Sequence, residues 1–137
     1  MKIAFADSVY WIAVVKPNDQ WADAAKKAKE SLGNARLVTT DEVLTEFLAA
    51  LGGSGQKLRE QAAKMVHAIV ANANVKVIPQ SRDSFLRGLD LYETRADKSC
   101  SLTDCISMNA MRAEALIEVL MHDHHFEQEG FTVLMKK

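Results

Sequence analysis

A helix start lies within the stretch Arg95-Ala-Asp-Lys-Ser-Cys-Ser-Leu-Thr-Asp-Cys-Ile-Ser-Met108. Ser101 is a good N-cap residue, Asp104 follows three positions later, and an apolar run begins at Ile106. Asp104 is therefore expected in the first turn, near the positive end of the helix dipole. A lone carboxylate there commonly does no more than stabilise the helix, by about 0.3–1 kcal/mol. Asp104 is not alone, because other acids end or follow apolar runs elsewhere in the chain.

Short apolar runs alternate with amphipathic segments on both sides of this stretch. The expected strands are 2–6, 36–39, 75–78, 116–121 and 131–134, the last at an edge of the sheet. The expected helices are 9–15, 20–32, 41–51, 57–71, 82–92 and 102–114. Alternation of this kind predicts an α/β fold with a mostly parallel, four- to five-stranded sheet and helices on both faces. We expect one domain over residues 1–137, because no long linker divides the chain.

The composition is that of an ordinary globular protein, with 48% hydrophobic and 26% charged residues. The net charge of −1 argues mildly against a nucleic-acid binder, which is usually basic. No apolar run approaches the length of a membrane span, and Asp7 interrupts the N-terminal apolar stretch, so we expect a cytoplasmic protein without a signal peptide. Cys100 and Cys105 are expected to be half-buried packing residues rather than a disulfide or a zinc site.

Several acids are expected at one edge of the sheet. Asp7 and Asp123 each follow an apolar strand directly, and ligands bind at the carboxyl ends of parallel strands. The helix that begins near Asp104 has its N-terminus at the same edge. A fourth acid is expected from helix 41–51, where the apolar pattern disfavours Glu42 and leaves Asp41 and Glu46 open.

Carboxylates gathered at one point repel one another. Two unit charges about 4 Å apart repel by roughly 4 kcal/mol at an effective dielectric constant of 20. A hard divalent cation such as Mg²⁺ or Mn²⁺ relieves this repulsion, because it prefers carboxylate oxygens and keeps several waters. A metal-bound water can attack a phosphoryl group whose charge the metal neutralises. The pattern therefore points to hydrolysis of a phosphodiester.

Four segments resemble a known family. They are Phe5-Ala-Asp7-Ser8, Val38-Thr-Thr-Asp-Glu-Val-Leu-Thr-Glu46, Asp97-Lys98 with Ser101-Leu-Thr-Asp104-Cys-Ile-Ser107, and His122-Asp123-x-His125-Phe126 with Gly130-Phe131. In this order and spacing they resemble the PIN domain family, most closely the VapC-type toxin ribonucleases of toxin–antitoxin systems. The resemblance covers essentially the whole chain. Many relatives carry a further acid and an aromatic where this chain has Ser99-Cys100, which affects substrate preference more than catalysis.

The resemblance implies a set of site residues and partners. The catalytic, metal-binding acids would be Asp7, Glu46, Asp104 and Asp123, with Glu46 preferred to Asp41, and the ion would be Mg²⁺ or Mn²⁺. Residues beside the acids or the substrate would be Ser8, Asp97 and Thr103, and Arg95 and Lys98 are candidates for phosphate contact. The implied protein is an endoribonuclease that cuts RNA, forms a homodimer and is silenced by a cognate antitoxin.

Other interpretations stay open at this point. A non-catalytic domain of the same fold could use the acids to dock a basic partner, and a PIN nuclease could process RNA without being a toxin. The same acids would also suit a deoxyribonuclease or a phosphatase. His122, His124 and His125 raise the possibility of zinc, but the expected oxygen ligands favour packing or hydrogen bonding of His125 near Asp123. Trp11 and Trp21 are expected to be core or interface residues.

Overall fold

The computed structural model describes residues 2–96 and 99–137. Its strands are β1 Ile3–Ala6, β2 Arg36–Thr40, β3 Val75–Ile78, β4 Glu118–Leu120 and β5 Thr132–Val133. Its helices are α1 Ser8–Val15, α2 Ala22–Leu32, α3 Asp41–Gly52, α4 Gln56–Ala71, α5 Arg82–Thr94, α6 Leu102–Ala113 and α7 His124–Gln128. The expected residues Asp97 and Lys98 lie outside the described part of the chain.

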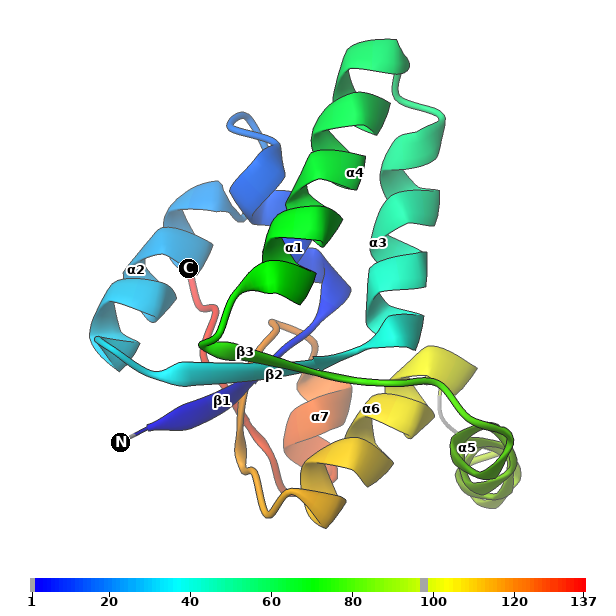
Figure 1. The fold of residues 1–137 in the computed structure, drawn as a ribbon. Helices are drawn as coiled ribbons and strands as arrows, with labels where there is room; N and C mark the ends of the chain where they lie inside the picture. Colours follow the sequence, from blue (N-terminus) through cyan, green and yellow to red (C-terminus); the bar gives the residue numbers. More distant parts are fainter. Residues whose placement is uncertain (1, 97–98) are drawn as a thin grey trace.

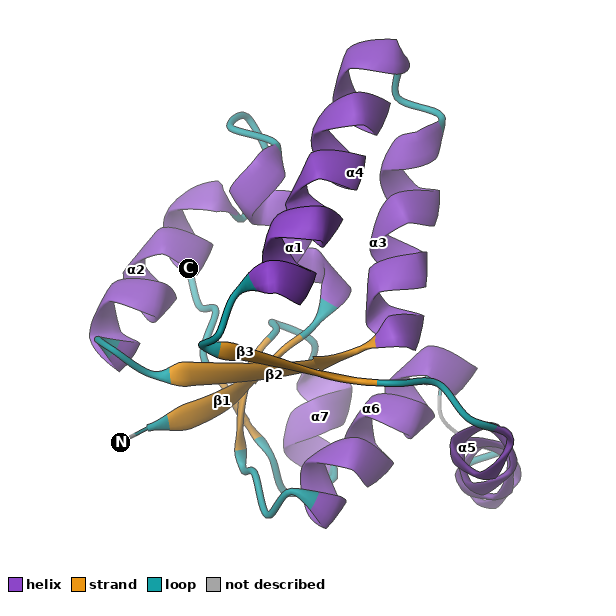
Figure 2. Ribbon diagram, in the orientation of Figure 1, coloured by secondary structure: helices purple, strands orange, loops and turns teal. Residues whose placement is uncertain are grey.

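The strands form a parallel sheet in the order β3-β2-β1-β4-β5. Helices α1 to α4 lie on one face of the sheet and α6 and α7 on the other, with α5 packed beside α6 (Figures 1 and 2). The central strand β1 is buried on both faces, since Ala4, Phe5 and Ala6 are inaccessible to solvent. The predicted α/β class, the parallel sheet, the helices on both faces and the edge position of β5 are confirmed.

Ser101 begins a helix as expected, and Thr40 and Ser81 begin the helices expected at 41–51 and 82–92. The side chain of Thr40 accepts a hydrogen bond from the Val43 backbone N–H at 3.1 Å and begins α3. Ser81 and Ser101 each form a capping box with the residue three positions later. These local bonds satisfy backbone donors that a helix leaves unpaired, which explains why the starts were visible in the sequence.

Helix α7 is not among the helices expected from the sequence, which predicts only a turn between β4 and the last strand. The side chain of Asp123 caps this helix by accepting from the His125 backbone N–H at 2.9 Å. Gly130 follows in a left-handed conformation, with φ of 94°. A helix of five residues is too short to show a helical period.

The two tryptophans and two cysteines lie in different surroundings. Trp11 is buried in the core, as expected. Trp21 is half-buried and stacks on His122, with ring centroids 3.9 Å apart. Cys100 and Cys105 are unpaired and buried rather than half-buried. Among the described residues, no helix has the length and apolarity to cross a membrane.

Candidate active site

Asp7 is the most buried of the acids, with only 1% of its surface exposed. It lies between the end of β1 and the start of α1, and its backbone N–H donates to the Leu120 carbonyl of β4 at 3.4 Å. Burial raises the pKa of Asp7 well above its ordinary value, and the charges of Asp104 and Glu46 raise it further, against a smaller lowering by the amides of Ser8 and Val9. One of its carboxylate oxygens, Oδ1, is buried and has no hydrogen-bond partner.

Glu46 lies on α3 and is held by the residue that follows Asp7. The Ser8 hydroxyl donates to Glu46 Oε1 at 2.6 Å, so α1 and α3 are joined beside the buried carboxylate. Asp41, the alternative left open by the apolar pattern, instead accepts the Gln80 backbone N–H at 2.9 Å. Of these two acids, Glu46 is therefore the one in electrostatic contact with Asp7.

Asp104 lies in the first turn of α6, as predicted, and forms the capping box with Ser101. The backbone N–H of Ser101 donates to Asp104 Oδ2 at 3.2 Å, and the Asp104 N–H donates to the Ser101 hydroxyl at 3.0 Å. Burial raises the pKa of Asp104, the Ser101 bonds lower it, and the charges of Glu46 and Asp123 raise it. The net direction is upward, so the repulsion and burial outweigh the cap.

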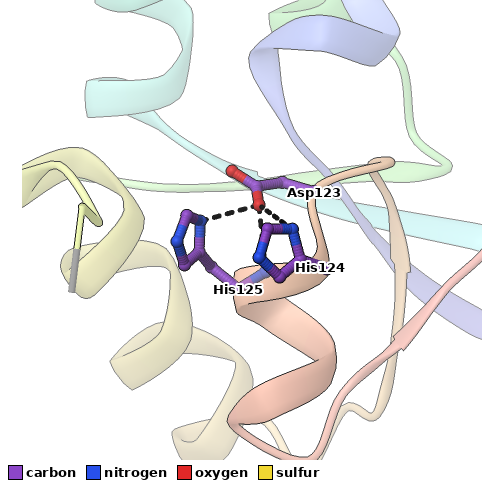
Figure 3. Close-up of side chains that lie close together, drawn as sticks. All are labelled: Asp123, His124 and His125. Atoms are coloured by element: carbon purple, nitrogen blue, oxygen red, sulfur yellow. Dashed lines mark hydrogen bonds and ion pairs between the residues drawn. The ribbon is translucent and has the colours of Figure 1, made fainter.

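Asp123 is held by its two histidine neighbours (Figure 3). Its Oδ1 lies 2.7 Å from His125 Nδ1 and 3.6 Å from His124 Nδ1, and it accepts the His125 backbone N–H. Burial alone would raise the pKa of Asp123, but the His125 amide and ring, followed by His124, lower it overall. Asp123 is thus the member of the group best kept as a charged carboxylate.

The structure brings the four acids of the sequence prediction into one electrostatic group. Asp7 interacts with Glu46 and Asp104, and Asp104 interacts with Glu46 and Asp123. They remain more widely spaced than the ligands of a bound ion, since within residues 2–96 and 99–137 three ligand atoms lie within 4.8 Å of one another only for Asp123, His124 and His125.

A hard cation fits this donor set. Asp7, Glu46, Asp104 and Asp123 offer only carboxylate oxygens, the ligands that Mg²⁺ and Mn²⁺ prefer. The unpartnered oxygen of Asp7 is buried, and a cation would supply the interaction that it lacks. A bound cation would also attract these carboxylates and lower the pKa values of Asp7 and Asp104, which burial raises.

Arg95, a candidate for phosphate contact, binds Glu129 in the described structure. Its Nε and a terminal nitrogen donate to the two oxygens of Glu129 at 2.6 and 3.0 Å. Arg112 donates to the same carboxylate at 3.0 Å and lies over the ring of Phe131. The two guanidinium groups lower the pKa of Glu129 to about 2, with the Arg95 hydrogen bonds as the largest cause. These ion pairs tie the end of α7 to α6 and to the segment after α5.

Replacing Glu129 with Gln is expected to lower the free energy of unfolding at pH 7 by about 1–2 kcal/mol. The lowering of the Glu129 pKa from 4.5 to about 2 corresponds to at most about 3.4 kcal/mol, and screening reduces it because both arginine side chains are about a third or more exposed. The pKa is lowered on folding, so this stability is present above 4.5 and is lost as pH falls towards 2. Urea denaturation at pH 7 and pH 3 measures both effects, and exposed Glu127→Gln is the control, expected to change little.

The remaining predicted residues have mixed surroundings. Ser8 is buried and bonds to Glu46, whereas Thr103 is half-buried in the first turn of α6 next to Asp104. Surface shape does not mark this site: a groove of about 860 Å³ lies between α5 and α6, and none of the four acids lines it. Chemistry rather than depth therefore identifies the acidic group as the candidate active site.

Sequence reasoning missed the contribution of two residues. Glu129, at the end of α7, carries no sequence signal for the ion pairs that it forms with Arg95 and Arg112. Ser99 was noted only as a departure from the family pattern, yet its hydroxyl lies 3.0 Å from His125 Nε2. Both contacts join segments more than 15 residues apart, so no local period could have shown them.

No family model and no curated protein sequence matches the chain, so the comparison rests on solved structures. VapC20 of Mycobacterium tuberculosis, a toxin that cleaves the sarcin–ricin loop, superposes with a TM-score of 0.85 at 23% identity, over 98% of this chain and 100% of VapC20. The chain has the fold of a VapC toxin. VapBC2 of Rickettsia felis, solved with a DNA fragment from its promoter, gives a TM-score of 0.67 at 13% identity, over 96% of both chains. The VapC-type fold predicted from the sequence is thus confirmed.

Proposed function

We propose that this chain is a Mg²⁺- or Mn²⁺-dependent endoribonuclease and the toxin of a toxin–antitoxin pair. One observation supports this most: three carboxylates from three elements, Asp7, Glu46 and Asp104, act on one another's charge at the carboxyl edge of a VapC-type sheet. Keeping Asp7 buried beside two half-buried carboxylates that repel it is costly to a protein that does not use them. A docking surface for a basic partner would not require Asp7 to be buried.

The residues have different tasks in this proposal. Asp7, Glu46, Asp104 and Asp123 would hold the ion, which when bound supplies an activated water and neutralises charge on the phosphoryl group. Ser8 fixes the rotamer of Glu46 through its hydroxyl, and Ser101 fixes Asp104 through the capping box. Because these supports lie on helices, the carboxylates are held in place before substrate arrives.

The partners are a further part of this proposal. We propose RNA as the substrate, an antitoxin as the inhibitor, a homodimer as the assembly and the cytoplasm as the location. The similarity to the toxin VapC20 and to the VapBC2 pair supports the first two. The structured loop that VapC20 cleaves is a suitable first substrate, with transfer RNA and messenger RNA as further candidates.

The test is an RNA cleavage assay with the purified full chain. Cleavage of one of these RNAs is expected with Mg²⁺ or Mn²⁺, and its loss is expected when a chelator removes the ion. Duplex and single-stranded DNA of matching sequence are the controls and should stay intact. Cleavage that persists in chelator would overturn the metal-dependent mechanism, and no cleavage of any RNA with either ion would favour the non-catalytic interaction domain.

A further inference from the structure

We propose that Asp123, His124 and His125 form a second binding site, which shares Asp123 with the acidic group, for a borderline divalent ion of the zinc class. Their ligand atoms lie within 4.8 Å of one another, and no other group of three in the described residues does so (Figure 3). Figure 3 shows both imidazole rings beside the same carboxylate oxygen, at the point where β4 leads into α7. One oxygen and two imidazole nitrogens are a donor set that suits zinc better than magnesium.

His125 carries a second, independent indication. Its side chain is only 17% exposed, and its Nδ1 lies 2.7 Å from Asp123 Oδ1, so this nitrogen is directed at the carboxylate. At the other side of the ring, Nε2 lies 3.0 Å from the Ser99 hydroxyl. Histidine ligands of metals commonly have their second nitrogen held by such a partner, which fixes the orientation of the ring. Nδ1 is thus a largely buried nitrogen, already oriented towards Asp123, that a metal would share with that carboxylate.

The separations suit a common ion. Ligands at about 2.0–2.2 Å from zinc are roughly 2.9 Å apart at an angle of 90° and roughly 3.4 Å apart at the tetrahedral angle. The two nitrogen distances to Asp123 Oδ1, 2.7 and 3.6 Å, lie on either side of this range. The rings of His124 and His125 are inclined by 27°, so one must turn to aim at the same point. His124 is 69% exposed and stacks only one face on the His125 ring, so its ring has solvent-filled space in which to turn.

The cysteines are poorly suited to this site. Among the described residues, the ligand atoms that lie within 4.8 Å of one another belong to Asp123, His124 and His125, and neither Cys100 nor Cys105 is in this group. The histidines rather than the cysteines therefore define the zinc ligands.

Zinc binding here has a consequence that rests on the proposed function. Asp123 belongs to both groups, because its charge acts on Asp104. An ion held by His124 and His125 would direct Asp123 Oδ1 away from the other acids. Zinc is then expected to inhibit RNA cleavage at concentrations that leave Mg²⁺ in large excess.

The binding test uses the purified full chain and Zn²⁺ in competition with a chromophoric chelator. The unaltered protein is expected to bind one Zn²⁺, and His125→Ala and His124→Ala are each expected to weaken binding. Ser99→Ala is expected to weaken it by roughly 10-fold, the lower end for loss of a residue that orients a ligand, and the histidine variants by more. His67→Ala is the matched control, because His67 is exposed on α4, and it should leave the affinity unchanged.

Two further measurements separate the zinc proposal from the nuclease proposal and from misfolding of the variants. Proton and nitrogen NMR of the four imidazoles should show Zn²⁺ acting on His124 and His125 but not on His67, with no variant needed. Asp7→Asn should retain Zn²⁺ binding even if it loses activity, so a failure of the nuclease proposal leaves this result standing. Undiminished Zn²⁺ binding in a folded double variant of His124 and His125, or NMR shifts confined to other residues, would overturn the proposed site.

Discussion

Asp7→Asn is expected to reduce metal-dependent RNA cleavage by at least about 100-fold, above the roughly 10–100-fold range seen when only an outer partner of a metal ligand is removed. The amide keeps the size of the side chain but loses the charge that would hold the ion. The Asp7 side chain makes no capping hydrogen bond to α1, so the substitution removes no cap and the local fold is preserved. Initial rates of cleavage of a labelled RNA, compared at equal protein and saturating Mn²⁺, measure the loss.

A matched pair of variants on α3 tests the same site. Glu46→Gln is expected to cause a comparable loss, because Glu46 acts on both Asp7 and Asp104. Asp41→Asn on the same helix is expected to leave the rate within about twofold, since Asp41 bonds instead to the Gln80 backbone. Equal losses in the two variants, or full activity in Asp7→Asn, would contradict the assignment of the acids.

Without metal, Asp7→Asn is expected to be more stable than the unaltered protein, although it is less active. The pKa of Asp7 is raised on folding, so the favourable contribution of its neutral form is complete below 3.8 and is lost as pH rises through the folded value. Above the raised pKa the ionised carboxylate is therefore unfavourable in the folded state, and Asn should there stabilise the metal-free protein by about 1–2 kcal/mol. A protein that is more stable and inactive is typical of a substitution in a functional site.

Much of this arrangement was available from the sequence because it is local. Ser101 and Asp104 announce a helix start within four residues, and Asp7 and Asp123 each follow a strand directly. The parallel sheet then carries these positions to one edge, which the α/β alternation predicts. The apolar period could not choose between Asp41 and Glu46, because both lie near the margin of the stripe.

What the sequence could not supply depends on side chains from distant segments. The Ser8–Glu46 hydrogen bond distinguishes Glu46 from Asp41, the other candidate on α3, and it joins residues 38 positions apart. Helix α7 depends on the Asp123 cap, whose aspartate had been interpreted only as a metal ligand. Asp123 thus both caps α7 and belongs to the candidate site, and its place after a strand indicates only the second of these roles.

Mn²⁺ is expected to raise the stability of the chain by about 2.7 kcal/mol when its free concentration is 100 times its dissociation constant and it binds only the folded state. The four acids gather only on folding, because they come from segments far apart in the sequence. A thermal melt with and without Mn²⁺ measures the effect. Asp41→Asn should retain it, whereas Asp7→Asn should lose most of it.

The pH dependence of this stabilisation provides the sharper test. Protons and Mn²⁺ compete for the carboxylates, and the pKa values of Asp7 and Asp104 are both raised. Stabilisation by Mn²⁺ should therefore shrink as pH falls through these raised values, while the metal-free protein loses its contribution from neutral Asp7 as pH rises through them. Plots of melting temperature against pH, measured with and without Mn²⁺, should therefore diverge as pH rises. Parallel curves would mean that the ion does not bind these acids, and the docking-domain interpretation would then account better for them.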